Sequence, residues 1–229
     1  MGTHETGLPT GGSGHDYGDR SGIYLGQRSV EVKVKSWVPS VGAQDAFLIS
    51  HHESLSIANL LTVPGETSLQ PAYRPTVCYA YSPCPLTVRS LEKWRDAGYA
   101  HPVQKTLLRD TLIEGYNQLG VLFIYRGGAY WYGSTLTLEH ARDMAPFNSA
   151  TTLQVAAGII GALDWMMRHP EEGVVEAETI DHEEVLSVAR PYLGEVRGYF
   201  TDWQPGKNGD LSFSVFRVDT EQCKGGHIS

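Results

Sequence analysis

The sequence predicts an α+β fold in which a mixed, largely antiparallel sheet packs against several helices. Strings that alternate apolar and polar side chains, as at 30–38, occur between segments with helical spacing. At 121–133, two β-rich strings are joined by a short turn that contains glycine, which is typical of a β-hairpin. No G-x-G-x-x-G string opens a strand–helix unit, so a complete Rossmann domain is not expected in this chain.

The first elements are expected between residues 30 and 81. The alternation VEVKVKSWV at 30–38 predicts a half-exposed antiparallel strand, and AFLIS at 46–50 predicts a second strand. Residues 54–61 are expected to form a short helix that ends before a Pro-Gly pair. The string at 73–81 is rich in β-branched and aromatic residues and predicts a third strand.

Two helices and the hairpin follow. Apolar residues recur at helical spacing over 85–97 and again over 103–119, where Gly120 would be the C-cap of the second helix. The strings at 121–125 and 129–133 form the two arms of the hairpin around Arg-Gly-Gly.

The second half of the chain begins with capped helices. Thr137 is suited to cap a short helix, and Ser149 to cap the longest one, at 149–169. This long helix is apolar nearly all round, and Gly158 and Gly161 would allow another backbone to approach it closely. It is therefore expected to be central or buried in an interface.

The remaining segments set the expected domain organisation. A strand is expected at 174–177 and a helix at 181–190. From Thr201 onward the sequence is polar and predicts mainly loops. Residues 1–22 are predicted to be a loop-rich arm, 23–203 the main domain and 204–229 a polar tail.

Composition narrows the possible partners and the compartment. Lysine and arginine number 18 against 26 acidic residues, a net charge of −8, so neither nucleic acid nor an anionic membrane is expected as a partner. The start of the chain has no signal-peptide pattern, and a cytoplasmic location is expected. Three cysteines without a C-x-x-C pair indicate neither a disulfide framework nor a zinc site.

One candidate for acid–base chemistry lies at the end of the second strand. Adjacent strand residues point to opposite faces, so His51 and His52 are poorly placed to share a metal ion, and no metal is expected. A single imidazole beside a carboxylate, His51 near Glu53, is suited to act as general acid or base. The alternative is a hydrogen-bonded loop histidine.

The aromatic string of the hairpin is a candidate for binding a cation. Trp131 faces away from its two tyrosine neighbours and offers a π surface to a protonated amine. The alternative is a buried hairpin that packs on the long helix. The aromatic string at 199–203 could likewise be a cation pocket or a docking edge, without a catalytic role.

Several strings, in order, resemble the C-terminal substrate domain of bacterial homospermidine synthases, which are related to saccharopine dehydrogenases. The resemblance extends from the first residues to Trp203. The strings that carry it include FLISHHESLSIAN at 47–59, YRPTVCYAYSPC at 73–84, QLGVL at 118–122, AYWYGS at 129–134 and PYLGEVRGYFTDW at 191–203.

The resemblance implies an activity and a set of ligands. Such enzymes bind NAD in an N-terminal Rossmann domain and oxidise putrescine to an imine. A second diamine then displaces ammonia, and the new imine is reduced. The substrate pocket binds ammonium groups, and the substrate domain contributes to a homodimer, to which the long helix 149–169 is suited.

The resemblance also carries over residue by residue. His51 matches the active-site histidine, and Glu53 and Trp131 are candidate substrate-binding residues. Asn117 stands where the family has an aspartate of the diamine site, and Gln118 stands where it has a glutamate. An amide can still accept a hydrogen bond from an ammonium group but lacks the charge. Ser82 likewise replaces a histidine.

Because the resembling strings begin at Gly2, the chain is expected to be the C-terminal half alone, inactive unless another chain supplies the NAD-binding half. Two other readings stay open. The chain could be a non-catalytic oligomerising or polyamine-binding module, which the neutral Asn117, Gln118 and Ser82 favour. It could also be a related dehydrogenase that acts on a different amine.

Overall fold

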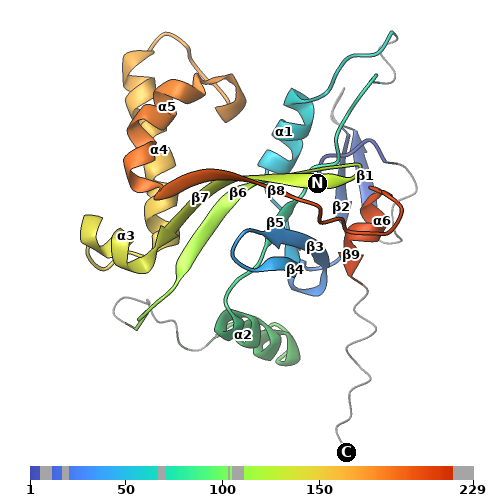
Figure 1. Cartoon of the computed structure of the whole chain (residues 1–229), viewed down its shortest axis with the longest axis horizontal. Helices are drawn as coiled ribbons and strands as arrows, with labels where there is room; N and C mark the ends of the chain where they lie inside the picture. The colour runs from blue at the N-terminus through green and yellow to red at the C-terminus, as the bar shows by residue number, and fades with distance from the viewer. Residues whose placement is uncertain (6–11, 17–20, 67–70, 103, 105–110, 219–229) are drawn as a thin grey trace, which may run out of the picture. The chain divides into compact units, whose positions relative to one another are not determined.

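A computed structural model describes residues 1–229 apart from 6–11, 17–20, 67–70, 103, 105–110 and 219–229 (Figure 1). The chain divides into two compact units. Unit 1 comprises Met1–Pro102, Ile124–Gly127 and Trp203–Ser229, and unit 2 comprises Val103–Phe123 and Gly128–Asp202. The domain boundaries expected after residues 22 and 203 stay a prediction.

Unit 1 contains a four-stranded antiparallel sheet in the order β5-β4-β3-β9 and a separate hairpin, β1-β2. The sheet is central to the unit because Val34 in β3 and Phe213 in α6 are each only 1% exposed. The strands are β1 Gly12–Asp16, β2 Ser21–Leu25, β3 Lys33–Val38, β4 Gly42–Ile49, β5 Tyr79–Tyr81 and β9 Arg217–Val218. The helices are η1 Ser29–Glu31, α1 Glu53–Leu60, α2 Pro85–Asp96 and α6 Phe213–Phe216.

Most predictions for the first hundred residues are confirmed. Strands β3 and β4 include most of 30–38 and 46–50, and α1 and α2 match the expected helices at 54–61 and 85–97. The strand predicted at 73–81 is wrong over most of its length, because only β5 is a strand there. Before β5 the backbone makes single bridges, Val63 with Tyr73 and Gly2 with Val77. Pro75 between them has no N–H to donate to a continuous ladder.

Residues 201–218 contain more regular structure than their polar composition predicts. They include α6 and β9, and β9 extends the sheet by pairing with β3 at Lys33 and Val34. The backbone N–H of Phe213 donates to Glu5 Oε2 at 2.8 Å, which joins the two ends of the described chain within unit 1. A buried aromatic ring with a fixed backbone makes this segment part of the core.

The described residues of unit 2 form a three-stranded antiparallel sheet in the order β6-β7-β8 and three α-helices. Figure 1 shows α4 and α5 packed side by side. The core includes Leu136, Ala141, Ala150 and Leu153. The elements are β6 Tyr116–Tyr125, β7 Gly128–Thr137, α3 Leu138–Met144, α4 Ala150–Arg168, η2 Ala177–Thr179, α5 His182–Ala189, η3 Arg190–Tyr192 and β8 Glu195–Thr201; the hairpin turn after Phe123 belongs to unit 1.

The hairpin and the three helix caps of unit 2 are confirmed. Strands β6 and β7 are joined by a two-residue turn in which Gly127 has a φ of +96°. Thr137 Oγ1 accepts from the N–H of His140, and Ser149 Oγ accepts from the N–H of Thr152. Asp181 Oδ1 caps α5 by accepting from two backbone N–H groups. Short polar side chains in these positions satisfy N–H groups that have no partner within the helix.

Two predictions in unit 2 are wrong. Residues 116–119, expected to end a helix, belong to β6, while 103 and 105–110 of that helix lie outside the described residues. Gly120 is a strand residue, and a Cβ there would lie 2.6 Å from Trp131 Cζ2. Pairing with β7 therefore overrides the helical spacing. The strand at 174–177 is instead irregular and leads into η2, and β8 was not predicted.

Helix α4 is only partly buried. Its inner face includes Leu153, Ala157 and Trp165, which are between 0 and 8% exposed. Its outer face carries large apolar residues that are about half exposed or more: Val155, Ile159, Ile160, Leu163, Met166 and Met167. Helix α4 is also long and apolar enough to cross a membrane, judged by length and composition alone. Core helices of soluble proteins meet the same criterion. The expectation that no membrane is a partner therefore stays a prediction.

Candidate functional site

The His51 side chain lies in unit 1 between the end of β4 and the start of α1. Its Nδ1 contacts Glu53 Oε2, and its ring stacks on Tyr79 of β5 with centroids 4.5 Å apart and planes at 19°. Ser54 Oγ donates to the His51 carbonyl at 2.9 Å. An ionised carboxylate can only accept, so Nδ1 carries the hydrogen and Nε2 is the basic atom. Glu53 thus holds one edge of the imidazole, and Tyr79 covers one face of it.

A small hollow opens beside this imidazole. It has a volume of about 210 Å³ and is lined by Met1, Tyr24, Ser50, His51, His52 and Leu55. The His51 side chain is 41% exposed and the Glu53 side chain 50% exposed. A ligand could therefore reach both groups from solvent. The predicted pair of a histidine and a nearby carboxylate is present, whereas its catalytic role stays a prediction.

Two groups near His51, Tyr79 in β5 and Cys78 just before it, have displaced pKa values. Burial raises the pKa of Tyr79, and the negative charges of Glu53 and Tyr81 raise it further. Burial likewise raises the pKa of the Cys78 thiol to about 11. Both side chains therefore keep their protons at neutral pH, and Tyr79 faces His51 as a neutral ring.

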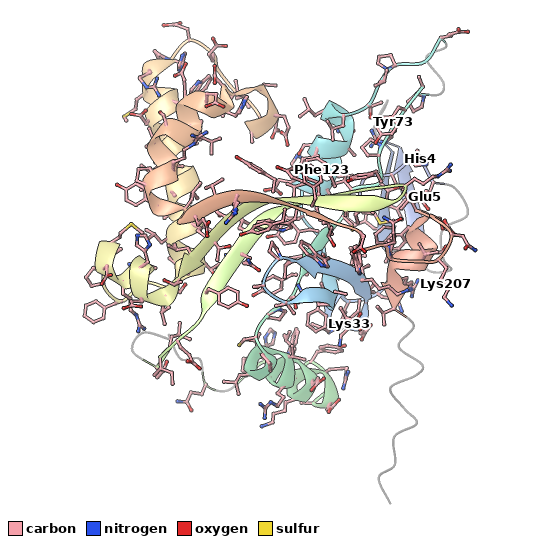
Figure 2. The ribbon with its side chains drawn as sticks, viewed as in Figure 1. His4, Glu5, Lys33, Tyr73, Phe123 and Lys207 are labelled. Carbon is pink, nitrogen blue, oxygen red and sulfur yellow. The ribbon has the colours of Figure 1, made fainter. Side chains whose placement is uncertain are left out.

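A larger hollow in unit 1, of about 410 Å³, lies between the first residues and the loop before α6. His4, Glu5, Arg126 and Asp210 are among its lining residues. Figure 2 labels His4 and Glu5. Glu5 is engaged there, because Oε1 accepts from Thr76 Oγ1 at 2.7 Å and Oε2 accepts from the Phe213 N–H. These bonds give Glu5 a structural role in joining distant segments.

Metal binding finds no support among the residues that the structure describes. Within that part of the chain, no group of three or more His, Cys, Asp or Glu side chains lies close enough to hold an ion. His51 and His52 are adjacent, and Glu53 contacts Nδ1 of His51. The expectation of a metal-free site stays a prediction.

Asn117 and Trp131 lie on neighbouring strands of unit 2, β6 and β7. Asn117 Nδ2 donates to Gln154 Oε1 at 2.6 Å, and Gln118 Nε2 donates to Thr135 Oγ1 at 3.1 Å. Both amides therefore make hydrogen bonds inside the protein.

Trp131 is 3% exposed. Its ring covers Gly120 and lies 6.0 Å from the ring of Tyr199, which is directly opposite on β8. A buried indole has little surface to offer a cation. This favours the alternative interpretation, in which the hairpin is buried by packing. Substrate binding by Trp131 stays a prediction.

Sequence reasoning missed Gln154 and Tyr79. Gln154 is 2% exposed and is the polar member of the otherwise apolar inner face of α4. A single amide on a predicted buried face is a signal that could have found it, because buried polar groups need partners. The ring contact of Tyr79 with His51 depends on β5 pairing with β4, which no local pattern reports.

The described strands do not form a dinucleotide-binding fold. Every strand pairing with a described register is antiparallel, and the β6–β7 pair is a hairpin. A dinucleotide fold instead needs parallel strands with a glycine-rich turn into a helix. We therefore assign no NAD contact to the described residues.

Comparison with known proteins identifies relatives over nearly the whole chain. No family model matches it. Homospermidine synthase of Mesorhizobium japonicum is 41% identical over 206 residues, 89% of this chain and 42% of that protein. Homospermidine synthase of Blastochloris viridis is 42% identical over 205 residues, 89% of this chain and 43% of that protein.

A solved structure agrees in fold as well as in sequence. The crystal structure of homospermidine synthase from Legionella pneumophila in complex with NAD has a TM-score of 0.85 and 41% identity, covering 96% of this chain and 50% of that one. The predicted resemblance and the α+β fold are both confirmed. The chain spans about half the length of the relatives it matches. It is therefore a homologue of the homospermidine synthases that corresponds to about half of their length.

Proposed function

We propose that the chain is the C-terminal substrate domain of a homospermidine synthase-like enzyme, which transfers an aminobutyl group between diamines such as putrescine. The observation that carries this proposal is 41–42% identity over 89% of the chain to proteins of that name. The exposed pair of His51 and Glu53 beside a hollow supports it from the residues themselves.

His51 is assigned the proton transfers of this reaction. An ammonium group must lose a proton before its nitrogen can attack an imine carbon, and the ammonia that leaves must gain one. With Nδ1 directed to Glu53, the His51 Nε2 atom can take and return that proton. Tyr79 supports the ring from one face and limits its rotation.

Ammonium binding is assigned to acceptor groups of the chain. Glu53 has a half-exposed carboxylate, and Asn117 is a neutral acceptor in unit 2. The net charge of −8 favours cationic ligands over anionic ones at long range. Trp131 is a further candidate for ammonium binding, although its ring is buried.

The redox half of the reaction belongs to NAD, which when bound accepts and later returns two electrons and a proton. The described strands form no dinucleotide-binding fold, so NAD would be bound mainly by another chain or by a further part of a longer protein. On this proposal the 229-residue chain alone binds a diamine and does not form homospermidine.

The outer face of α4 is assigned to a homodimer. Six large apolar side chains are exposed there along one helix, and apolar residues concentrate in the buried centres of homodimer interfaces. This surface could equally serve the oligomerising module without catalysis. That second function is favoured by Asn117, Gln118 and Ser82, which are neutral where the family carries ionisable groups.

Calorimetric titration of the chain with putrescine and, separately, with NAD tests the proposal. We expect putrescine to bind and NAD not to bind. His51→Gln should leave putrescine binding within a few-fold of the native value, while homospermidine formation falls at least about 100-fold when an NAD-binding half is added. No putrescine binding, or NAD binding by the isolated chain, would contradict the proposal. Putrescine binding with no activity in the presence of that half would favour the module.

A further inference from the structure

Two side-chain amides of unit 2 lie against each other: the half-buried Asn117 on β6 and the buried Gln154 on α4. Gln154 is 2% exposed and makes three side-chain hydrogen bonds. Its Nε2 donates to Ser134 Oγ at 2.9 Å and to the Leu193 carbonyl at 3.2 Å, and its Oε1 accepts from Asn117 Nδ2 at 2.6 Å. All polar atoms of the Gln154 carboxamide therefore have partners.

The Leu193 carbonyl decides which way both amides face. A backbone carbonyl can only accept a hydrogen bond, so the Gln154 atom that meets it must be Nε2. The Ser134 hydroxyl can donate or accept, and it is compatible with either orientation. With Nε2 fixed at Leu193, Oε1 must face Asn117.

The same reasoning then passes to Asn117. Because Gln154 Oε1 can only accept, Asn117 must present Nδ2 to it. The oxygen and nitrogen of a planar carboxamide lie on opposite sides of the Cγ atom, so Oδ1 faces away from Gln154. Within the described part of the chain, no protein group donates to Asn117 Oδ1, and the residue is half-buried.

We propose that Gln154 is a positioning residue that holds the Asn117 carboxamide with Oδ1 presented to the ligand. Position 117 then accepts a hydrogen bond from an ammonium group without carrying a negative charge. The ligand role of Oδ1 rests on the proposed diamine function, whereas the orientation of the amide does not. Without Gln154, the Asn117 amide could turn over and offer a donor, which repels an ammonium group.

The orientation is measured by side-chain amide NMR on the full chain. The Asn117 Nδ2 protons are assigned by their loss in Asn117→Leu, and their exchange with water is compared between variants. Gln154→Met keeps the shape of the side chain and removes its acceptor, so the exchange rate of Asn117 Nδ2 should rise at least about 10-fold. Asn148→Ala, which removes an amide outside this network, should leave that rate unchanged.

Gln154→Glu is the rescue variant. Ionised or protonated, a glutamate at 154 offers an oxygen to Asn117 Nδ2, and the protonated form can also donate to the Leu193 carbonyl. Slow exchange of Asn117 Nδ2 should therefore return in Gln154→Glu. A purely structural requirement for glutamine would not predict this recovery. If Gln154→Met folds poorly, Gln154→Glu still tests whether an acceptor at position 154 orients the Asn117 amide.

Putrescine titration completes the test. Gln154→Met and Asn117→Leu should each weaken putrescine binding about 5- to 20-fold, and the double variant should be no weaker than Asn117→Leu alone, because Gln154 acts through Asn117. Unchanged exchange in Gln154→Met, or additive losses of affinity, would overturn the positioning role. A third outcome is that amide exchange responds as expected but putrescine changes the Asn117 amide signals neither in the native chain nor in any variant. That outcome would overturn the ligand role and count against the diamine function.

Discussion

At the scale of single residues, environment gives the two described cysteines opposite properties. Cys78 lies beside β5, where burial raises the pKa of its thiol to about 11. Cys84 is exposed before α2, and hydrogen bonds with the side chain and backbone of Thr87 lower the pKa of its thiol. The thiolate is the nucleophile, so the fraction of thiolate at a given pH sets the reactivity of each cysteine.

Alkylation with iodoacetamide tests this difference in a Cys223→Ser background. We expect Cys84 to be modified first, at a rate whose rise with pH has its midpoint below the ordinary value for a thiol. Cys78 should stay unmodified at pH 8 and begin to react only as the pH approaches 11, because its folded pKa lies above the ordinary thiol value. Peptide mass spectrometry distinguishes the two sites, and modification of Cys78 at pH 8 in folded protein would contradict the assignment.

Arg74 is a second residue whose role follows from its contacts. Its side chain is 4% exposed, and burial lowers its pKa. Nε donates to the Thr3 carbonyl at 3.2 Å, while Nη1 donates to the Ala58 carbonyl at 3.3 Å and to Thr62 Oγ1 at 2.8 Å. The guanidinium thus joins the first residues of the chain to the end of α1.

Arg74→Lys should lower the free energy of unfolding by about 1–3 kcal/mol, because one ammonium group cannot replace a planar fork of donors. Urea denaturation measures the change. Arg95→Lys is the matched control, since the Arg95 side chain is 48% exposed and pairs with neighbouring Asp96. That substitution should change stability by less than about 0.5 kcal/mol. Equal effects of the two variants would show that burial of Arg74 contributes nothing.

At the scale of elements, α4 shows how packing gives identical residues different roles. A Cβ at Gly161 would lie 2.7 Å from the Val185 carbonyl oxygen of α5, whereas a Cβ at Gly158 would have no atom within 4 Å. The expected close approach of another backbone is therefore confirmed for Gly161. For Gly158 no other backbone of the described residues comes close, and the expected approach at an interface stays a prediction.

The two glycines form a matched pair of substitutions. Gly158→Ala should raise the free energy of unfolding by about 0.5–1 kcal/mol, because alanine restricts the unfolded chain and favours helix. Gly161→Ala should lower it by about 1–3 kcal/mol, because α4 and α5 would have to separate. Thermal unfolding monitored by circular dichroism measures both. A stabilising effect at Gly161 would contradict the packing of α4 on α5.

At the scale of the whole molecule, the outer face of α4 determines the expected assembly. Its apolar residues repeat every three or four positions over several helical turns, and surfaces of this kind mark interaction sites in soluble proteins. The capped start of α4 and its inner face fix the helix in unit 2 independently of any partner. The outer residues can therefore be changed without removing the core of the unit.

Ile159→Lys combined with Leu163→Lys should shift the chain from dimer to monomer and weaken self-association at least about 100-fold, because two charges per subunit would be buried without partners. Sedimentation equilibrium measures the assembly, and circular dichroism checks that the helices remain. Val41→Lys combined with Leu86→Lys, at exposed apolar residues of unit 1, is the control and should leave self-association unchanged. A native chain that is monomeric at high concentration would contradict the homodimer.

The sequence by itself determined the features that depend on neighbours along the chain. Short polar residues mark the starts of α3, α4 and α5 because they satisfy free N–H groups locally, and the hairpin turn follows from its glycine. Tertiary structure decided what depends on distant partners. Residues 116–119 are a strand because β7 pairs with them, and the Asn117 amide is oriented by Gln154 and Leu193, residues far along the chain. Periodicity cannot report such contacts, because hydrogen-bond partners and cross-strand pairs are chosen in space.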